Sequence, residues 1–168
     1  STFRRIYNER VNSVDFHAKP DVQSKSGNYI IYNGRKYPIH WDMVKLWTEI
    51  DGLEARKGCY SDYSGKDDRD IKMFVCHWDV TTSAKTTQKV LNKRGISVTF
   101  LIGADGCIYQ TCDMQNATWH AGGRKWNHSS TGVEINNAYS MKYGPWYVRH
   151  GYGERPIWRG NVHGQTLK

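Results

Sequence analysis

A short apolar run that ends in a histidine constrains the fold of this chain more than any other feature. Residues 73–76 read Met-Phe-Val-Cys, and His77 follows them directly. Such a run, bounded by polar residues, is typical of a strand buried on both faces, and strands of this kind lie in the centre of α/β sheets. A chain of 168 residues has the length of one domain. We therefore expect an α/β fold built around a strand over residues 71–77.

A polar segment at residues 65–70, here called the polar seam, separates two regions with different patterns of apolar residues. The region before the seam is too small to bury a core of its own, so we expect it to pack on the rest. We predict an N-terminal extension over residues 1–66 and a main domain over residues 67–168. The extension should hold a β-hairpin and one helix.

The hairpin and the helix each have a local signal. Asn33-Gly34 separates two strand-like segments, 29–32 and 35–39, and both turn residues accept positive φ, which predicts a hairpin. Asp42 is a candidate N-cap for the helix. The apolar residues that follow it recur at helical spacing: Met43, Leu46, Trp47 and Ile50.

Strand and helix signals alternate in the main domain. Residues 86–93 read as a short helix that stops at Gly95, and residues 97–102 return to a strand pattern. A turn sequence then leads into 107–110, which predicts a second hairpin, and residues 131–136 form a further strand pattern.

The charge balance limits the classes of partner. Lys and Arg number 24 against 16 Asp and Glu, which gives a net charge of +8. Such a surface favours a polyanion: nucleic acid, a membrane surface or an anionic cell wall. No apolar run approaches the roughly 20 residues needed to cross a bilayer, and no signal peptide is seen at the start. Charge alone does not choose among these partners.

Two ionisable residues lie in or at the end of predicted strands. His77 is either a metal ligand or a hydrogen-bonded structural histidine. Glu134, between Val133 and Ile135, lies either on a solvated strand face or in a cleft. Beside a metal-bound water, a carboxylate in a cleft could act as the general base of a hydrolysis.

A glycine-rich loop with aromatic residues precedes the Glu134 strand. It reads Trp119-His120-Ala-Gly-Gly, and Trp126 follows nearby. Aromatic rings among small residues suit the faces of sugars or peptides, although the same residues also occur in ordinary loops.

Together, these segments resemble the zinc-dependent N-acetylmuramoyl-L-alanine amidases of type 2. That family includes phage endolysins and peptidoglycan recognition proteins. The resemblance rests on motifs in the same order and with similar gaps, over about residues 71–137: 74–77, 99–110, 119–122, Asn127 and 130–136.

The resemblance implies a fold, a reaction and a site. The fold is an α/β mixed central β-sheet flanked by helices, and the reaction cleaves the amide between the muramoyl lactyl group and L-alanine with Zn²⁺ as cofactor. His77 matches the first zinc ligand, and Glu134 matches the acid that accepts the proton. Trp119, His120 and Asn127 match the residues that hold glycan and peptide.

The remaining zinc ligands do not follow the family pattern. The resemblance implies a long helix after the Glu134 strand, then a His and an Asp or Cys. After Glu134 the sequence holds only His150 and His163 and no Asp or Cys, so these two histidines are the candidate substitutes. We expect either a piece of a longer polypeptide, lacking its C-terminal helix and ligand segment, or a fold kept without the chemistry.

Two classes of function remain open at this stage. The first is a peptidoglycan amidase, a phage endolysin or virion-associated lysin that acts at the bacterial cell wall. The second is a non-catalytic amidase-like module that binds peptidoglycan or has a structural role in a virion. The expected partner is bacterial peptidoglycan, with other virion proteins as further candidates and no nucleic acid.

Overall fold

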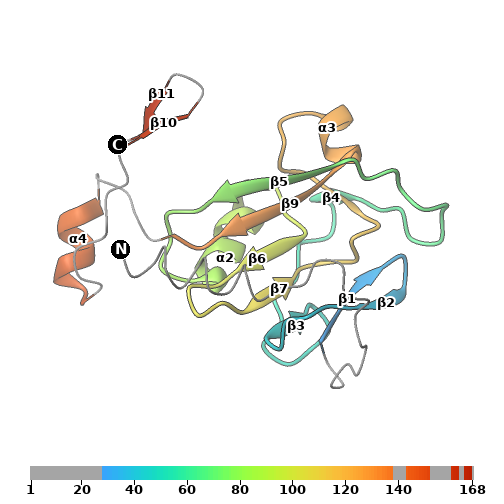
Figure 1. Ribbon diagram of the computed structural model, residues 1–168, viewed down its shortest axis with the longest axis horizontal. Coiled ribbons are helices and arrows are strands. Elements are labelled where there is room, and N and C mark those ends of the chain that lie inside the picture. Colours follow the sequence, from blue (N-terminus) through green and yellow to red (C-terminus); the bar gives the residue numbers. More distant parts are fainter. Residues whose placement is uncertain (1–27, 138–142, 152–159, 163–164, 168) are drawn as a thin grey trace.

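A mixed five-stranded sheet forms the centre of the molecule (Figure 1). The structure, a computed structural model, describes residues 28–137, 143–151, 160–162 and 165–167. Across the sheet the strands are β3 (Val44–Leu46), β7 (Ile108–Gln110), β6 (Phe100–Ile102), β9 (Ser130–Ile135) and β5 (Met73–Trp78). All neighbours are parallel except β6 and β7, which form the predicted second hairpin. The expected α/β fold with a mixed central sheet is confirmed.

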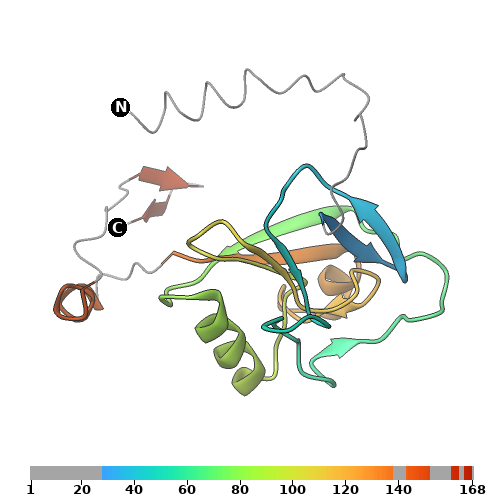
Figure 2. The same cartoon turned by 90° about the horizontal axis from the view of Figure 1, so that it is seen from below.

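One helix, α2 (Ala84–Arg94), covers one face of this sheet (Figure 2). The Ser83 side chain caps its first turn by accepting from the Thr86 N–H, and Gly95 ends it in the left-handed conformation at φ 70°. Its buried side chains join strand residues in the core: Ala84, Leu91, Val98 and Leu101. The helix and its glycine stop agree with the sequence prediction.

The strand that we expected in the centre of the sheet lies at its edge, which corrects the prediction. Among the described residues, β5 pairs only with β9. Phe74 and Trp78 are 61% and 50% exposed, whereas Met73, Val75 and His77 on the other face are half-buried. The apolar run therefore marks one half-buried face and one exposed face. Sequence alone could not show how many strands pair with it.

The predicted N-terminal hairpin is formed by β1 (Tyr29–Tyr32) and β2 (Arg35–Pro38). Asn33 and Gly34 both have positive φ, 48° and 71°, as the Asn-Gly turn requires. Hydrogen bonds tie the hairpin to the main domain, because the Asp113 carboxylate accepts from the backbone N–H groups of Asn33 and Gly34 at 2.8 Å each.

The helix expected over residues 43–50 is wrong. Val44–Leu46 forms strand β3, which pairs with β7, and turns follow it. A Cβ on Gly52 would lie 2.2 Å from the Leu46 carbonyl oxygen, so the chain turns back tightly there. The apolar spacing suits a helix, but pairing with β7 and this turn decide the structure. A strand from the first region thus completes the central sheet.

The other elements are short. β4 (Tyr60–Ser61) pairs with β8 (Ala117–Thr118), and β10 (Gly160–Val162) pairs with β11 (Gln165–Leu167). The short helices are α3 (Arg124–His128) and α4 (Gly144–Arg149). No helix in the described part of the chain is long and apolar enough to cross a membrane.

Candidate active site

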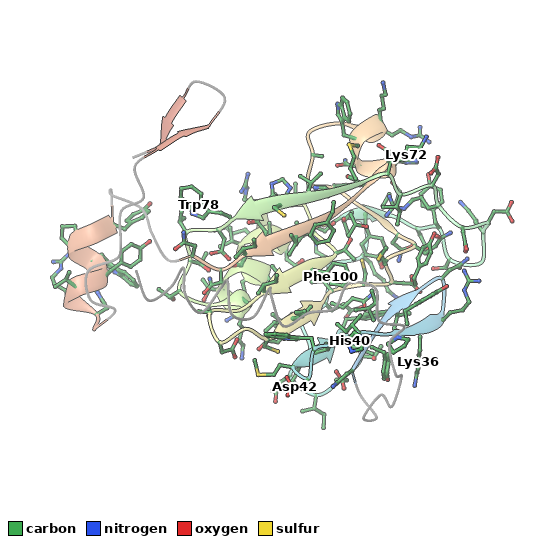
Figure 3. All side chains as sticks on the ribbon, in the orientation of Figure 1. Lys36, His40, Asp42, Lys72, Trp78 and Phe100 are labelled. Atoms are coloured by element: carbon green, nitrogen blue, oxygen red, sulfur yellow. The ribbon has the colours of Figure 1, made fainter. Side chains whose placement is uncertain are left out.

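Two neighbouring parallel strands bring His77 and Glu134 together. In the register of β5 and β9, His77 lies opposite Glu134. Paired residues of neighbouring strands point to the same face of a sheet, so these side chains share one face. Leu101 of β6 pairs with Glu134 from the other side and belongs to the core under α2. The apolar side chain of Trp78, the next residue, points to the opposite face at the tip of β5 (Figure 3).

His120 reaches His77 from the loop after β8. The Nδ1 atom of His120 lies 2.9 Å from the Nε2 atom of His77, and the two rings meet edge-on at a centroid distance of 5.1 Å. The Asn127 side chain fixes this loop, because its Oδ1 accepts from the backbone N–H groups of His120 and Ala121 at 3.1 and 2.8 Å. The structure thus joins His77, the loop of Trp119 and His120, and Asn127, which the sequence placed in three separate motifs.

A chain of hydrogen bonds assigns the protons on both histidines. The Ser130 hydroxyl donates its single proton to the Trp126 carbonyl at 2.6 Å, so its oxygen can only accept from His120 Nε2 at 3.2 Å. His120 therefore has its proton on Nε2, and its Nδ1 accepts from His77 Nε2. The lone pair on His77 Nδ1 is left free in this arrangement. An unprotonated imidazole nitrogen can bind a metal or accept a proton.

Both imidazoles are shifted towards the neutral form. Burial lowers the pKa of His77. Burial also lowers the pKa of His120 to about 4, with further contributions from His77 and Arg69. Neutral rings near pH 7 agree with a chain in which His77 donates to His120 and His120 donates in turn to Ser130.

Gly132 makes room for the His120 ring. A Cβ added at this residue would lie 2.6 Å from Cγ and 2.8 Å from Nδ1 of His120, closer than real Cβ contacts allow. The ring therefore packs directly on the backbone of β9. Its position depends on the absence of a side chain at residue 132.

Glu134 has a buried carboxylate oxygen without a partner. Its Oε2 atom is buried and makes no hydrogen bond within the described structure. Burial, aided by the negative charge of Asp79 and opposed by Arg94, raises the pKa of Glu134 to about 7. A carboxyl group that titrates near neutral pH is suited to take up and release a proton.

Asp79 is a buried acid that the sequence analysis did not single out. It is 8% exposed, and its carboxylate accepts from the side chains of Thr87 and Asn136 and from the backbone N–H groups of Thr81 and Asn137. These bonds join the ends of β5 and β9 to α2. Its position two residues after His77, just beyond the end of the strand, was the available sequence signal.

Arg69 is the second residue that sequence reasoning did not find. It is 8% exposed, and its guanidinium donates to backbone carbonyls at 2.6 to 3.2 Å: those of Met114, Gln115, Asn116, Asn127, His128 and Ser130. A single cation thus holds the turn before β8 and the end of α3 in place. Its location in a polar seam suggested an exposed residue instead.

Trp119 lines a pocket of about 250 Å³. Its indole is 37% exposed, and its Nε1 donates to the Ser61 hydroxyl at 3.2 Å. The other lining residues are Arg124, Asn127 and His128. Of the residues matched to glycan and peptide contacts, Trp119 and Asn127 line this pocket, and His120 lies beside it.

The described residues do not make up a zinc site. No group of three His, Cys, Asp or Glu side chains that could hold a metal occurs among them. His150 lies in the turn after α4, where its Nδ1 is 2.8 Å from the Trp146 carbonyl and its ring stacks on Trp146. His163 lies outside the described residues. Within the described ranges, only His77 offers a free imidazole nitrogen beside Glu134.

A comparison with models of protein families agrees with the sequence resemblance. The family model described as N-acetylmuramoyl-L-alanine amidase matches residues 67–153, just over half of the chain. A crystal structure of a selenomethionine derivative of AmpD is similar at 15% sequence identity and a TM-score of 0.36, covering 64% of this chain and 80% of that one. Among curated proteins, no sequence matches this chain.

Proposed function

The chain belongs to the N-acetylmuramoyl-L-alanine amidase family, and we propose that it hydrolyses the amide between N-acetylmuramic acid and L-alanine, with Glu134 as general base. Membership of the family supports a peptidoglycan amidase in general. The observation that carries the assignment of Glu134 is its buried, unpartnered oxygen opposite His77. The raised pKa of this carboxyl group, about 7, suits a base that works near neutral pH.

The reaction needs one proton carrier, and Glu134 can fill that role. Its carboxylate takes a proton from water while the water oxygen bonds to the lactyl carbonyl carbon. The carbon–nitrogen bond then breaks, and Glu134 returns the proton to the departing amine. The products are a lactyl carboxylic acid and a peptide with a free L-alanine amino group.

The neutral histidine pair can orient this reaction. His77 Nδ1 presents a lone pair on the face that carries Glu134, and this atom would be the one that holds a zinc ion, because Nε2 donates to His120. Trp119, 37% exposed, offers an apolar wall for the substrate, and buried Asn127 holds the backbone of His120 and Ala121. We propose Trp119, His120 and Asn127 as substrate-binding residues on this basis.

Zinc dependence is part of the proposal because of the sequence resemblance. The described residues supply His77 and no complete ligand set, so further ligands have to come from outside them. His163 is one candidate in the sequence. We also propose action at the bacterial cell wall, as a phage endolysin or a virion-associated lysin, a role that rests on the same resemblance.

The test is hydrolysis of purified peptidoglycan by the chain with added zinc. We expect release of L-alanine amino termini, detected by an amine-reactive reagent, and its loss with a chelator. Glu134→Gln should lower the rate by roughly 100-fold or more while sedimentation with peptidoglycan stays unchanged. An unchanged rate in this variant would remove Glu134 from the mechanism.

A second function is favoured by the incomplete metal ligand set. Without three ligands in the described residues, the chain could serve as a non-catalytic peptidoglycan-binding or structural virion module. Sedimentation with peptidoglycan at all zinc concentrations, without release of amino termini, would identify this function.

A further inference from the structure

A row of lysines runs along the exposed side of α2. Lys85, Lys89 and Lys93 are all exposed and follow one another at intervals of four residues, so they lie on one side of the helix. That side points away from the buried residues Ala84 and Leu91. The row is about 12 Å long, because each residue of a helix rises about 1.5 Å. The helix therefore presents three positive charges in one line.

No acidic residue neutralises this lysine row within the part of the chain that the structure describes. The sequence of α2 contains no Asp or Glu, and the three lysines form no ion pair with any described residue. The carbonyl of Glu54 accepts from the Asn92 side chain, but the Glu54 carboxylate forms no ion pair with a described residue either. The charges of the row are therefore available to a ligand.

The lysine row works against the stability of α2. Lys85 lies in the first turn, where the helix macrodipole favours acidic side chains. Like charges four residues apart on a helix repel one another, and the row contains two such pairs. Only the charges in the last turn, such as Lys93, gain from the macrodipole. Helix stability thus does not account for the row, whereas an anionic ligand would remove its repulsion.

A neighbouring loop adds a positive charge at the C-terminal end of α2. The backbone N–H of Arg56 donates to the Asn92 side chain at 3.0 Å and so fixes the loop on the helix. A Cβ added at Gly95 would lie 3.6 Å from Nη2 of Arg56, so this guanidinium lies beside the helix end. We call the resulting surface the basic patch; it consists of Lys85, Lys89, Lys93 and Arg56.

The basic patch belongs to the helix that covers the Glu134 side of the sheet (Figure 2). Leu101 pairs with Glu134 and packs in the core with Ala84 and Leu91 of α2. The charge of Arg94, the last residue of α2, opposes the rise in the pKa of Glu134, so the end of the helix lies close to this carboxyl group. A polymer bound along α2 would therefore contact the side of the molecule that carries the candidate base.

We propose that the basic patch binds a phosphodiester polymer of the bacterial cell wall, distinct from peptidoglycan. Lysine ammonium groups act as point charges that suit single phosphate groups, and one straight row suits one extended anionic chain. Neither α2 nor residues 54–57 carry an aromatic side chain on which a base could stack, which disfavours a single-stranded nucleic acid. The choice of a wall polymer rests on the proposed action at the cell wall.

The experiment measures binding of the full chain to fluorescently labelled poly(glycerol phosphate) by anisotropy at several salt concentrations. The test variant carries Lys85→Gln, Lys89→Gln and Lys93→Gln. We expect its affinity to be lower by roughly tenfold or more at about 0.1 M salt. The slope of log affinity against log salt should become less steep by about 2, because each phosphate contact contributes about 0.7 for a single strand.

The matched control removes the same net charge from exposed lysines outside α2. It carries Lys36→Gln, Lys66→Gln and Lys72→Gln and should keep most of the affinity and of the salt slope. All six lysines are exposed, so circular dichroism should show both triple variants folded. Equal losses in the two triple variants, or no binding by the wild type, would overturn the proposal.

A single-stranded DNA with the same number of phosphates separates the two classes of polyanion. DNA binding as tight as that of poly(glycerol phosphate) would overturn the assignment to a wall polymer. The proposed hydrolysis is tested independently, because poly(glycerol phosphate) contains no amide to cleave. Both triple variants should release L-alanine amino termini from a small soluble muramoyl peptide at the wild-type rate. Failure of hydrolysis and failure of polymer binding are therefore distinguishable.

Discussion

Gly132 leaves room for the His120 ring, and adding one methyl group at residue 132 tests whether the ring position matters for hydrolysis. Gly132→Ala places a Cβ within 2.6 Å of the His120 ring and must push the ring off the strand. We expect the rate of amide hydrolysis to fall at least about tenfold, because His120 then loses its hydrogen bond with His77. The measurement is release of L-alanine amino termini from peptidoglycan.

Gly144→Ala is the matched control for this substitution. No atom lies within 4 Å of a Cβ added at Gly144, so this variant should keep the wild-type rate. ¹⁵N spectra of the imidazoles add a direct readout, since the proton on His77 Nε2 is assigned by the bond to His120. A wild-type rate and wild-type imidazole spectra in Gly132→Ala would show that the ring position does not matter.

The raised pKa of Glu134 predicts a dependence of stability on pH. Burial raises this pKa from 4.5 to about 7 in the folded state. Between these values the folded chain binds more protons than the unfolded chain, so the free energy of unfolding falls as pH rises. Glu134→Gln cannot ionise and should be more stable than the wild type at pH 8, by about 1 to 2 kcal/mol after allowance for solvent screening, but not at pH 4.

Urea unfolding at both pH values, with a chelator present, measures this difference. Wild type and variant are compared at each pH, so that changes in all other groups cancel. The same difference between the two proteins at pH 4 and pH 8 would contradict the assigned pKa.

At the scale of single residues, the sequence was informative where a residue type is unusual for its place. An acid in an apolar strand drew attention to Glu134, and a histidine at a strand end drew attention to His77. Asp79 gave only the weak signal of its place just after the strand, and Arg69 gave none, because charged residues in polar segments are usually exposed. Contacts with residues at least eight positions away in sequence contribute to the burial of both side chains.

At the scale of elements, local signals were sufficient for some segments and not for others. The Asn33-Gly34 hairpin and α2 with its Gly95 stop were predicted because a turn and a cap depend on nearby residues. β3 and the edge position of β5 were not predicted, since both depend on which strands pair across the sheet. Pairing partners distant in sequence leave little trace in a local apolar pattern.

Arg69 predicts how the elements around the site depend on one another. Arg69→Met leaves backbone carbonyls from the turn before β8, from α3 and from β9 without their buried donor. We expect the free energy of unfolding to fall by about 3 kcal/mol or more, as for other broken buried networks. Thermal and urea unfolding measure the loss.

Arg35→Met is the matched control for Arg69→Met. Arg35 bonds to Asp68 at 2.6 Å, but both side chains are at least half exposed, so its loss should change the melting temperature little. Equal losses in the two variants would show that the buried carbonyl network adds nothing beyond a surface charge.

At the scale of the whole molecule, the fold class followed from the order of the motifs, and the arrangement of the first region did not. β3 shows that residues before the polar seam complete the main sheet, so the seam does not separate two independent cores within the described residues. The division at residue 66 remains a prediction about sequence regions. Helix α4 formed in a segment without a convincing apolar period, where Tyr147 is buried and donates to the Val80 carbonyl at 2.9 Å.

The net charge of +8 predicts that wall binding and catalysis respond differently to salt. Attraction between a positive protein and an anionic cell wall acts over the Debye length, which shrinks from about 10 Å at 0.1 M salt to about 3 Å at 1 M. We therefore expect the chain to sediment with purified walls at low salt and to be released as salt rises. Hydrolysis of a small soluble muramoyl peptide should change far less, because Glu134 is partly buried and salt screens partly buried charges much less than exposed ones. Parallel sedimentation and amine-release assays over this salt range measure both. If sedimentation with walls and hydrolysis of the small substrate depended equally on salt, charge would act at the site itself and not over the whole surface.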